Sequence, residues 1–170
     1  SITGGADAAR FTIDAATGTL NFLVVPDYEV PSDANADNVY DVTVQVSDGS
    51  LTATQAIAVT VTAVNDNTPA ITTGSAFSVA ENTTTVTTVT ASDADLPAQT
   101  LAYSITGGSD AARFTIDAAT GALRFIAAPD HEAPSDANAD NVYDVTVQVS
   151  DGSLTASQAI AVTVTGVNDN

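Results

Sequence analysis

The sequence predicts an all-β protein built as tandem seven-strand Greek-key β-sandwiches, the first of which lacks its N-terminal strands. Three observations predict this fold. Apolar and polar residues alternate with a period of two over long stretches, Gly, Asp, Asn and Pro punctuate those stretches, and most of the chain occurs twice at a spacing that matches one sandwich domain.

The internal repeat fixes the size of the unit. Residues 1–67 align with residues 104–170 without a gap, at an offset of 103. Ten of the 67 aligned positions differ, so 57 are identical. Residues 68–103 have no counterpart at the front. We therefore assign residues 1–66 to a partial repeat and 67–170 to a complete one. We expect the partial repeat to be less ordered, or to be completed by strands from elsewhere.

The strands of the complete repeat follow from the alternation. Val145, Val147 and Val149, for example, alternate with polar residues, as half-buried strands do. The alanine-rich residues 109–113 predict one helical turn. In order, we expect strands at 77–79, 86–91, 101–105, 114–116, 122–126, 142–150 and 154–165.

Composition excludes several classes of function. The 21 Asp and Glu residues against 3 Lys and Arg give a formal net charge of -18, which argues against nucleic acid or an anionic membrane as a partner. Hydrophobic residues make up 44% of the chain, enough for a packed core. The absence of cysteine and the single His131 exclude thiolate and multi-histidine metal sites. No apolar run reaches the roughly 18 residues of a membrane span, so we expect no membrane insertion.

Oxygen-bearing side chains gather where the two copies join. Asn65, Asp66 and Asn67 offer carboxylate and amide oxygens, and Pro69 prevents a strand from running straight through. Each such cluster alone is typical of a turn. Together, however, many like charges must come close, and oxygens of this kind are the ligands of Ca²⁺, which takes six to eight at about 2.3–2.6 Å. Oxygen ligands without His or Cys disfavour zinc and copper.

The complete repeat carries short acidic motifs at the ends of its predicted strands, in a fixed order within one unit length. These motifs and the joint between the copies are Glu81 in the first strand, Asp93-Ala94-Asp95, Asp130-His131-Glu132, Ser150-Asp151-Gly152 and Asn65-Asp66-Asn67.

This set of motifs resembles cadherin repeats. The polar insertion at 134–141 and the lack of cysteine make the chain look like the cadherin-like tandem repeats of bacterial, RTX-type surface adhesins. The resemblance implies that each calcium site draws on the base of one repeat, the linker and the top of the next. Ala63 departs from the family pattern, whose linker begins with Asp.

Carried over by position, the resemblance implies two groups of ligands. The joint between the units would use Asp27 and Glu29 of the first unit, Asn65, Asp66 and Asn67 of the linker, and Asp93, Asp95 and Asp151 of the second unit, with a carbonyl in the loop 96–100. The next joint would use Glu81, Asp130, Glu132, Asn168, Asp169 and Asn170, and Asp48 would face the previous joint.

Residues 33–38 and their twin 136–141 show the oxygen spacing of a calcium loop without its later bidentate Glu. We favour a polar hairpin loop there over an extra weak calcium site.

The function implied is a calcium-rigidified structural or extender module of an extracellular adhesin, with neighbouring repeats of the same chain as partners. The alternative is an adhesive module that binds a cell-surface glycan or another copy of the adhesin. We expect no enzymatic activity, because the only histidine lies inside a proposed metal loop and has no twin in the other unit.

Overall fold

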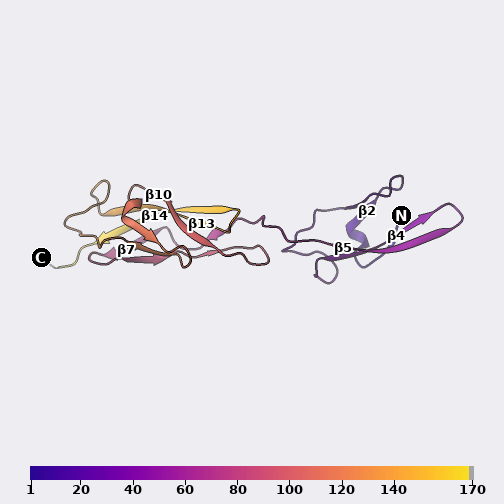
Figure 1. Ribbon diagram of the computed structural model, residues 1–170, viewed down its shortest axis with the longest axis horizontal. Helices are drawn as coiled ribbons and strands as arrows, with labels where there is room; N and C mark the ends of the chain where they lie inside the picture. The colour runs from indigo at the N-terminus through magenta and orange to yellow at the C-terminus, as the bar shows by residue number, and fades with distance from the viewer. Residues whose placement is uncertain (169–170) are drawn as a thin grey trace. The chain divides into compact units, whose positions relative to one another are not determined.

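The computed structural model describes residues 1–168, which form two compact units (Figure 1). Unit 1 is Ser1–Val64, and unit 2 begins at Asn65. Strands make up both units, apart from turns and two short 3-10 segments. The all-β prediction is therefore confirmed. Because each unit packs around its own core, each is described by itself.

The larger sheet of unit 2 has four strands in the order β10-β13-β14-β7 (Figure 1). The strands are β10 (Ala102–Gly107), β13 (Val142–Ser150), β14 (Thr155–Thr165) and β7 (Ala76–Ala80). The first three pair antiparallel, whereas β7 joins the outer edge of β14 in parallel. A parallel neighbour must arrive by a crossover, so the sheet recruits a strand from the start of the repeat.

The opposing layer of unit 2 is smaller. It consists of β11 (Phe114–Ile116), β12 (Ala122–Phe125) and β8 (Thr85–Thr88), paired in that order. A separate two-stranded pair joins β6 (Ala70–Ile71) to β9 (Ala91–Ser92). Each of the seven predicted strands has a counterpart, but the one expected at 86–91 is interrupted: β8 ends at Thr88, and β9 begins at Ala91. The short strand β6 was not predicted. The helical turn expected at 109–113 is the 3-10 segment Ala111–Arg113.

The core of unit 2 lies between these layers. Val145, Val147 and Val149 are at most 1% exposed, as the period-two pattern predicts. Phe114 and Phe125 stack with ring centroids 4.5 Å apart at the centre of the buried cluster. Aromatic pairs of this kind add about 0.5–1.5 kcal/mol beyond the area that they bury.

The polar loop before β13 is closed by two buried aspartates. Asp136 accepts the backbone N–H groups of Asp140 (2.9 Å) and Asn141 (3.3 Å). Asp110 accepts those of Ala137 (2.7 Å) and Asp144 (2.9 Å). Burial acts to raise the pKa of Asp136, but the backbone hydrogen bonds outweigh it and hold that pKa below its usual value. These carboxylates saturate N–H groups of the loop, which favours the polar-loop interpretation.

Unit 1 repeats the second part of this architecture. Its core centres on Phe11, Tyr40 and Val42. Its elements are β1 (Ile2–Gly4), the 3-10 segment Ala8–Arg10, β2 (Phe11–Ile13), β3 (Leu20–Phe22), β4 (Val39–Ser47) and β5 (Thr52–Thr60), in sheets of order β1-β4-β5 and β2-β3.

The two units offer a matched test of core packing. Val149 is fully buried, whereas the equivalent Val46 is 70% exposed. Val149→Ala should lower the free energy of unfolding of unit 2 by about 2 kcal/mol, because it removes buried methyl groups and leaves a cavity. Val46→Ala should change that of unit 1 by less than about 0.5 kcal/mol. Urea unfolding followed by NMR signals from each unit measures both values, and equal losses would contradict the assignment.

Candidate metal centre

Three carboxylates from distant parts of unit 2 converge at one end of the sandwich. Asp93 and Asp95 follow β9, and Asp151 begins the turn between β13 and β14. Each offers an oxygen, and these three oxygens lie within 4.8 Å of one another. These residues lie far apart in the sequence, so the folded sandwich is what brings their oxygens together.

Asp151 is fixed by its own turn. Its Oδ1 accepts the backbone N–H groups of Ser153 and Leu154, both at 2.7 Å. Burial acts to raise the pKa of this carboxyl, but these two hydrogen bonds and one from the Asn65 side chain hold the pKa below its usual value. Asp151 is therefore a carboxylate at neutral pH.

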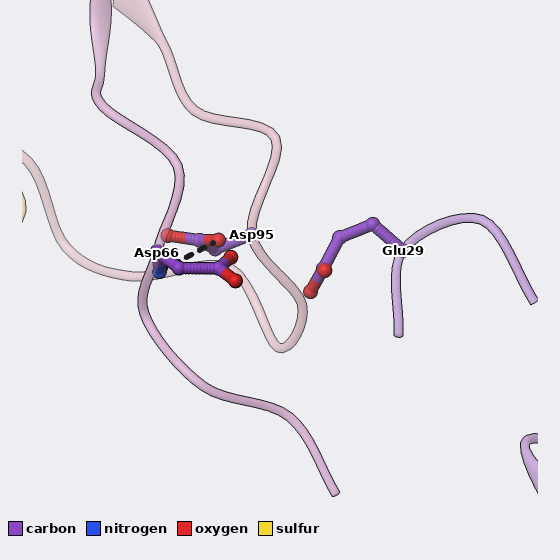
Figure 2. A group of neighbouring side chains, drawn as sticks. All are labelled: Glu29, Asp66 and Asp95. Carbon is purple, nitrogen blue, oxygen red and sulfur yellow. Dashed lines mark hydrogen bonds between the residues drawn. The ribbon is translucent and has the colours of Figure 1, made fainter. Parts of the chain in front are cut away.

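Asp95 connects the linker to the sandwich. Its Oδ1 accepts the backbone N–H of Asp66 (3.4 Å), the backbone N–H of Asn67 (3.1 Å) and the Asn67 side-chain Nδ2 (2.7 Å). Figure 2 shows Asp66 beside Asp95, with the first of these hydrogen bonds dashed. Asp93 in turn accepts the N–H of Asp95 at 2.9 Å. The linker start and the loop after β9 therefore form one hydrogen-bonded unit.

One oxygen of each carboxylate has no hydrogen-bond partner although it is buried. These atoms are Oδ2 of Asp93, Asp95 and Asp151. Asn65 Oδ1 is a fourth such oxygen in the same unit. A buried, unpaired polar oxygen costs about 1–3 kcal/mol, and more when it is charged. Three carboxylates this close also repel one another, by about 4 kcal/mol per pair near a protein surface.

A divalent cation bound to oxygen fits this arrangement. An ion that sits about 2.3–2.6 Å from each ligand requires oxygens no more than about 5 Å apart. The carboxylate oxygens meet that condition, because they lie within 4.8 Å of one another. The donor set consists of carboxylate and amide oxygens, which suits Ca²⁺ rather than zinc or copper.

A second acidic cluster lies within unit 2 and contains Glu81, Asp130 and Glu132, again with oxygens within 4.8 Å of one another. Glu81 is 2% exposed, and its two oxygens accept the backbone N–H groups of His131 (2.7 Å) and Val167 (2.6 Å). These hydrogen bonds lower the pKa of Glu81. Asp130 accepts the N–H of Glu132 at 3.0 Å. Asp130 and Glu132 are exposed, so this cluster is more open than the first.

Among the predicted ligands of unit 1, Asp27 and Asp48 are exposed and Glu29 is half-buried. Asp27 accepts the N–H of Glu29 at 2.9 Å. Asp48 accepts those of Ser50 and Leu51 at 2.9 and 2.7 Å, which lower its pKa. That Asp27 and Glu29 join the ligands of unit 2 stays a prediction.

The remaining predicted ligands differ in what the structure says of them. Asn168 is exposed at the end of the described chain. Asp169 and Asn170 lie outside the described residues. Asn67 turns its amide nitrogen toward Asp95, so its role as an oxygen ligand stays a prediction.

One unpartnered oxygen in the loop that follows Asp95 was not assigned from sequence. We expected only a carbonyl from the loop 96–100, whereas the Gln99 side chain buries an unpartnered Oε1. The signal that could have found it is an amide side chain four residues after Asp95, in a loop already expected to supply an oxygen.

Comparisons with known proteins identify the family. The family model described as "Cadherin domain" matches residues 75–165. Protocadherin Fat 1 of Homo sapiens is 32% identical over 181 residues, which cover 100% of this chain and 4% of that protein. Protocadherin-23 of Homo sapiens is 30% identical over 176 residues, covering 100% of this chain and 5% of that protein. The chain therefore spans a small fraction of these relatives.

Solved structures with a similar fold also contain cadherin domains. Protocadherin Gamma B2 extracellular cadherin domains 3-6 match with a TM-score of 0.70 and 26% identity over 99% of this chain and 41% of that one. Human protocadherin-24 EC1-2 matches in fold, with a TM-score of 0.73 and 20% identity over 98% of this chain and 81% of that one. Residues 1–168 contain no helix long and apolar enough to cross a membrane. With its sandwich fold and a family match over more than half its length, the chain belongs to the cadherin domain family.

Proposed function

We propose that this chain is a calcium-rigidified structural module of an extracellular adhesin, an extender whose calcium binds at the linker end of unit 2. One observation carries the proposal: buried oxygens of Asp93, Asp95, Asp151 and Asn65 have no hydrogen-bond partner. A folded protein tolerates such a group when something else supplies the missing interaction. Calcium, when bound, supplies positive charge and several coordination positions for oxygen.

The residues around the cluster do the positioning. The turn N–H groups hold Asp151 through Oδ1 and leave Oδ2 available. Asp95 uses Oδ1 to hold the linker and likewise leaves Oδ2 available. Neutralising the three charges removes the repulsion between the turn after β13 and the loop after β9, which holds the linker through Asp95. The linker then loses its freedom to move away from the sandwich.

The same kind of calcium site would form at the joint between the two units and at the joint to a following repeat. Asp27 and Glu29 would complete the site at the linker from the side of unit 1. Glu81, Asp130 and Glu132 would begin the corresponding site for a following repeat, together with residues 168–170. Extracellular calcium modules bind with dissociation constants of about 10⁻⁴–10⁻³ M. Such a chain would be stiff outside a cell and flexible in a chelator.

The adhesin context rests on sequence features. The polar insertion at 134–141 and the lack of cysteine support a bacterial, RTX-type surface protein. The matched relatives named above are human, and the matched Gamma B2 structure is titled as extracellular cadherin domains. An extracellular or cell-surface location is proposed on that basis.

A glycan-binding role finds no support in the described residues. Sugar platforms need exposed aromatic rings, but each Phe and Tyr of residues 1–168 is buried or half-buried. Tyr40 and Tyr143, for example, are both 1% exposed. The structural role is therefore preferred.

Calcium should raise thermal stability, because it binds the folded state and not the unfolded chain. For a dissociation constant of about 1 mM, about 10 mM CaCl₂ adds about 1.4 kcal/mol, or about 6–11 °C in Tm. Differential scanning calorimetry against a magnesium series at the same ionic strength measures the effect. A Tm that does not respond to calcium, or responds equally to magnesium, would sink the proposal.

Asp151 and Asp48 occupy equivalent positions in the two repeats, but we expect only the substitution of Asp151 to weaken calcium binding at the linker. Asp151→Asn removes a buried carboxylate from the three-carboxylate cluster and should weaken calcium binding at least ~tenfold, a loss of ~1.4 kcal/mol. Asp48→Asn changes an exposed turn carboxylate and should leave the affinity within about twofold. Isothermal titration calorimetry of both variants measures this, and equal affinities would contradict the assigned site.

The linker should change its freedom with calcium. Small-angle scattering should give a larger and better defined maximum dimension in calcium than in EGTA, because an empty cluster repels itself and releases the linker. Asp95→Asn should show the EGTA behaviour in both buffers. An unchanged maximum dimension for the unsubstituted protein would refute the rigidifying role.

A further inference from the structure

The polar insertion at 134–141 contacts residues 130–132, here called the ligand loop because it carries Asp130 and Glu132 of the second acidic cluster. Asn141, the last residue of the insertion, donates from its side-chain Nδ2 to the backbone carbonyl of His131 at 3.0 Å. His131 lies between the two exposed carboxylates. One amide side chain therefore reaches the middle of the ligand loop from 10 positions further along the chain.

The backbone of Asn141 is fixed on the larger sheet of unit 2. Its carbonyl accepts the N–H of Val164 in β14 at 2.8 Å, and β13 begins at the next residue. Its own N–H donates to Asp136 Oδ1 at 3.3 Å. The Asn141 side chain therefore extends from a rigid base, and its hydrogen bond ties the His131 carbonyl to the sheet.

The insertion has an uncommon backbone conformation just before the sheet. Ala139 and Asn141 have φ values of 59° and 63°. Asparagine tolerates this left-handed conformation, but alanine adopts it rarely. The buried carboxylate of Asp136 keeps the chain there, because it also accepts the N–H of Asp140 at 2.9 Å. A conformation this uncommon persists only where surrounding contacts impose it. Here it directs the Asn141 amide toward the ligand loop.

The first copy of the repeat makes the same contact. Asn38 Nδ2 donates to the Tyr28 carbonyl at 3.0 Å, and Ala36 and Asn38 have φ values of 57° and 64°. Tyr28 stands where unit 2 has His131, so the contact does not depend on the side chain at that position. It does not depend on Glu81 either, because residue 81 has no counterpart in unit 1. The contact is therefore a property of the insertion.

Two further contacts restrain the ligand loop of unit 2. The His131 N–H donates to Glu81 Oε2 at 2.7 Å. The His131 ring lies against Gly166, where an added Cβ would come 3.1 Å from Nδ1. Glu81 is itself a proposed ligand, so its oxygens are shared between the loop and an ion. The Asn141 amide is not a proposed ligand, so it can hold the loop whether or not an ion is bound.

We propose that Asn141 is a positioning residue for calcium at the second acidic cluster, and that positioning the ligand loop is a function of the polar insertion. This inference rests on the calcium-binding role proposed above. By holding the His131 carbonyl, the amide fixes the residues on either side, which are Asp130 and Glu132. A loop that is held in advance loses less conformational freedom when it binds an ion. Groups that orient metal ligands typically change metal affinity by about 10–100-fold when they are removed.

Asn141→Gly in the intact chain tests the inference, because glycine adopts a positive φ readily and the substitution removes the amide. Calcium titration followed by the NMR signals of residues 130–132 should give a dissociation constant about tenfold higher than in the unsubstituted protein. The signals of Asp93, Asp95 and Asp151 should give an unchanged constant. Equal constants at 130–132 in both proteins would overturn the inference alone. No response of 130–132 in the unsubstituted protein would overturn it together with the calcium role of this cluster.

Two matched variants separate positioning from general effects on the fold. Asn38→Gly makes the same change in unit 1, and Ala139→Gly relieves a positive φ in the same insertion but keeps the amide. Both should leave the dissociation constant at 130–132 within about twofold, because neither removes the hydrogen bond to His131. A tenfold loss in either control would contradict the role assigned to the Asn141 amide.

Amide hydrogen exchange without calcium gives a second measurement. The N–H groups of Glu132 and Ala133, which donate to Asp130 Oδ1 at 3.0 Å, should exchange at least ~threefold faster in Asn141→Gly, because the loop has lost its connection to the sheet. In Asn38→Gly the equivalent N–H groups of residues 29 and 30 should do so instead. Asn38→Gly decides the question by itself if Asn141→Gly does not fold. Unchanged exchange at 29 and 30 in that variant would then overturn the inference.

Discussion

The two oxygens of the Asp95 carboxylate have different roles, and the structure at the linker end of unit 2 depends on both. One oxygen accepts three hydrogen bonds from Asp66 and Asn67, and the other is buried without a partner beside Asp93 and Asp151. The first oxygen holds the chain where it enters the sandwich. The second is the oxygen that we propose a cation binds, because the three carboxylates, whose oxygens lie within 4.8 Å of one another, repel each other. In the proposed function, a single residue therefore connects the ordering of the linker to the binding of the cation.

Buried carboxylates have two roles in this fold, and their hydrogen bonds distinguish them. Asp110 and Asp136 use both oxygens on backbone N–H groups and so brace the loop before β13. Asp93, Asp95 and Asp151 each retain one buried oxygen without a partner. The oxygens of Asp110 and Asp136 therefore have their hydrogen-bond partners within the protein. The others have capacity for an ion, which is why an acidic cluster alone would not have identified the site.

The two units show how strongly the environment decides the role of a residue. Asp48 and Asp151 lie in the same local sequence and make the same turn hydrogen bonds, yet Asp48 is exposed and Asp151 is 7% exposed. Val46 and Val149 differ in the same way. In both cases residues 68–103 make the difference, because this segment supplies Asp93 and Asp95 and also covers the core. One segment therefore completes both the carboxylate cluster and the hydrophobic packing of unit 2.

The sequence by itself determined the strands, the repeat and the ligand types. Period-two alternation is local, so strands such as β13 follow from it. The alanine-rich residues 109–113 indicated the helical turn before Phe114, and the motif order indicated the family. Only the tertiary structure decided which oxygens remain available. That outcome depends on which N–H groups reach each carboxylate, such as that of Ala137 reaching Asp110 from 27 positions away. It also revealed the buried Gln99 oxygen and the different exposure of Val46 and Val149, because burial arises from contacts between distant segments and the local sequence is the same in both copies.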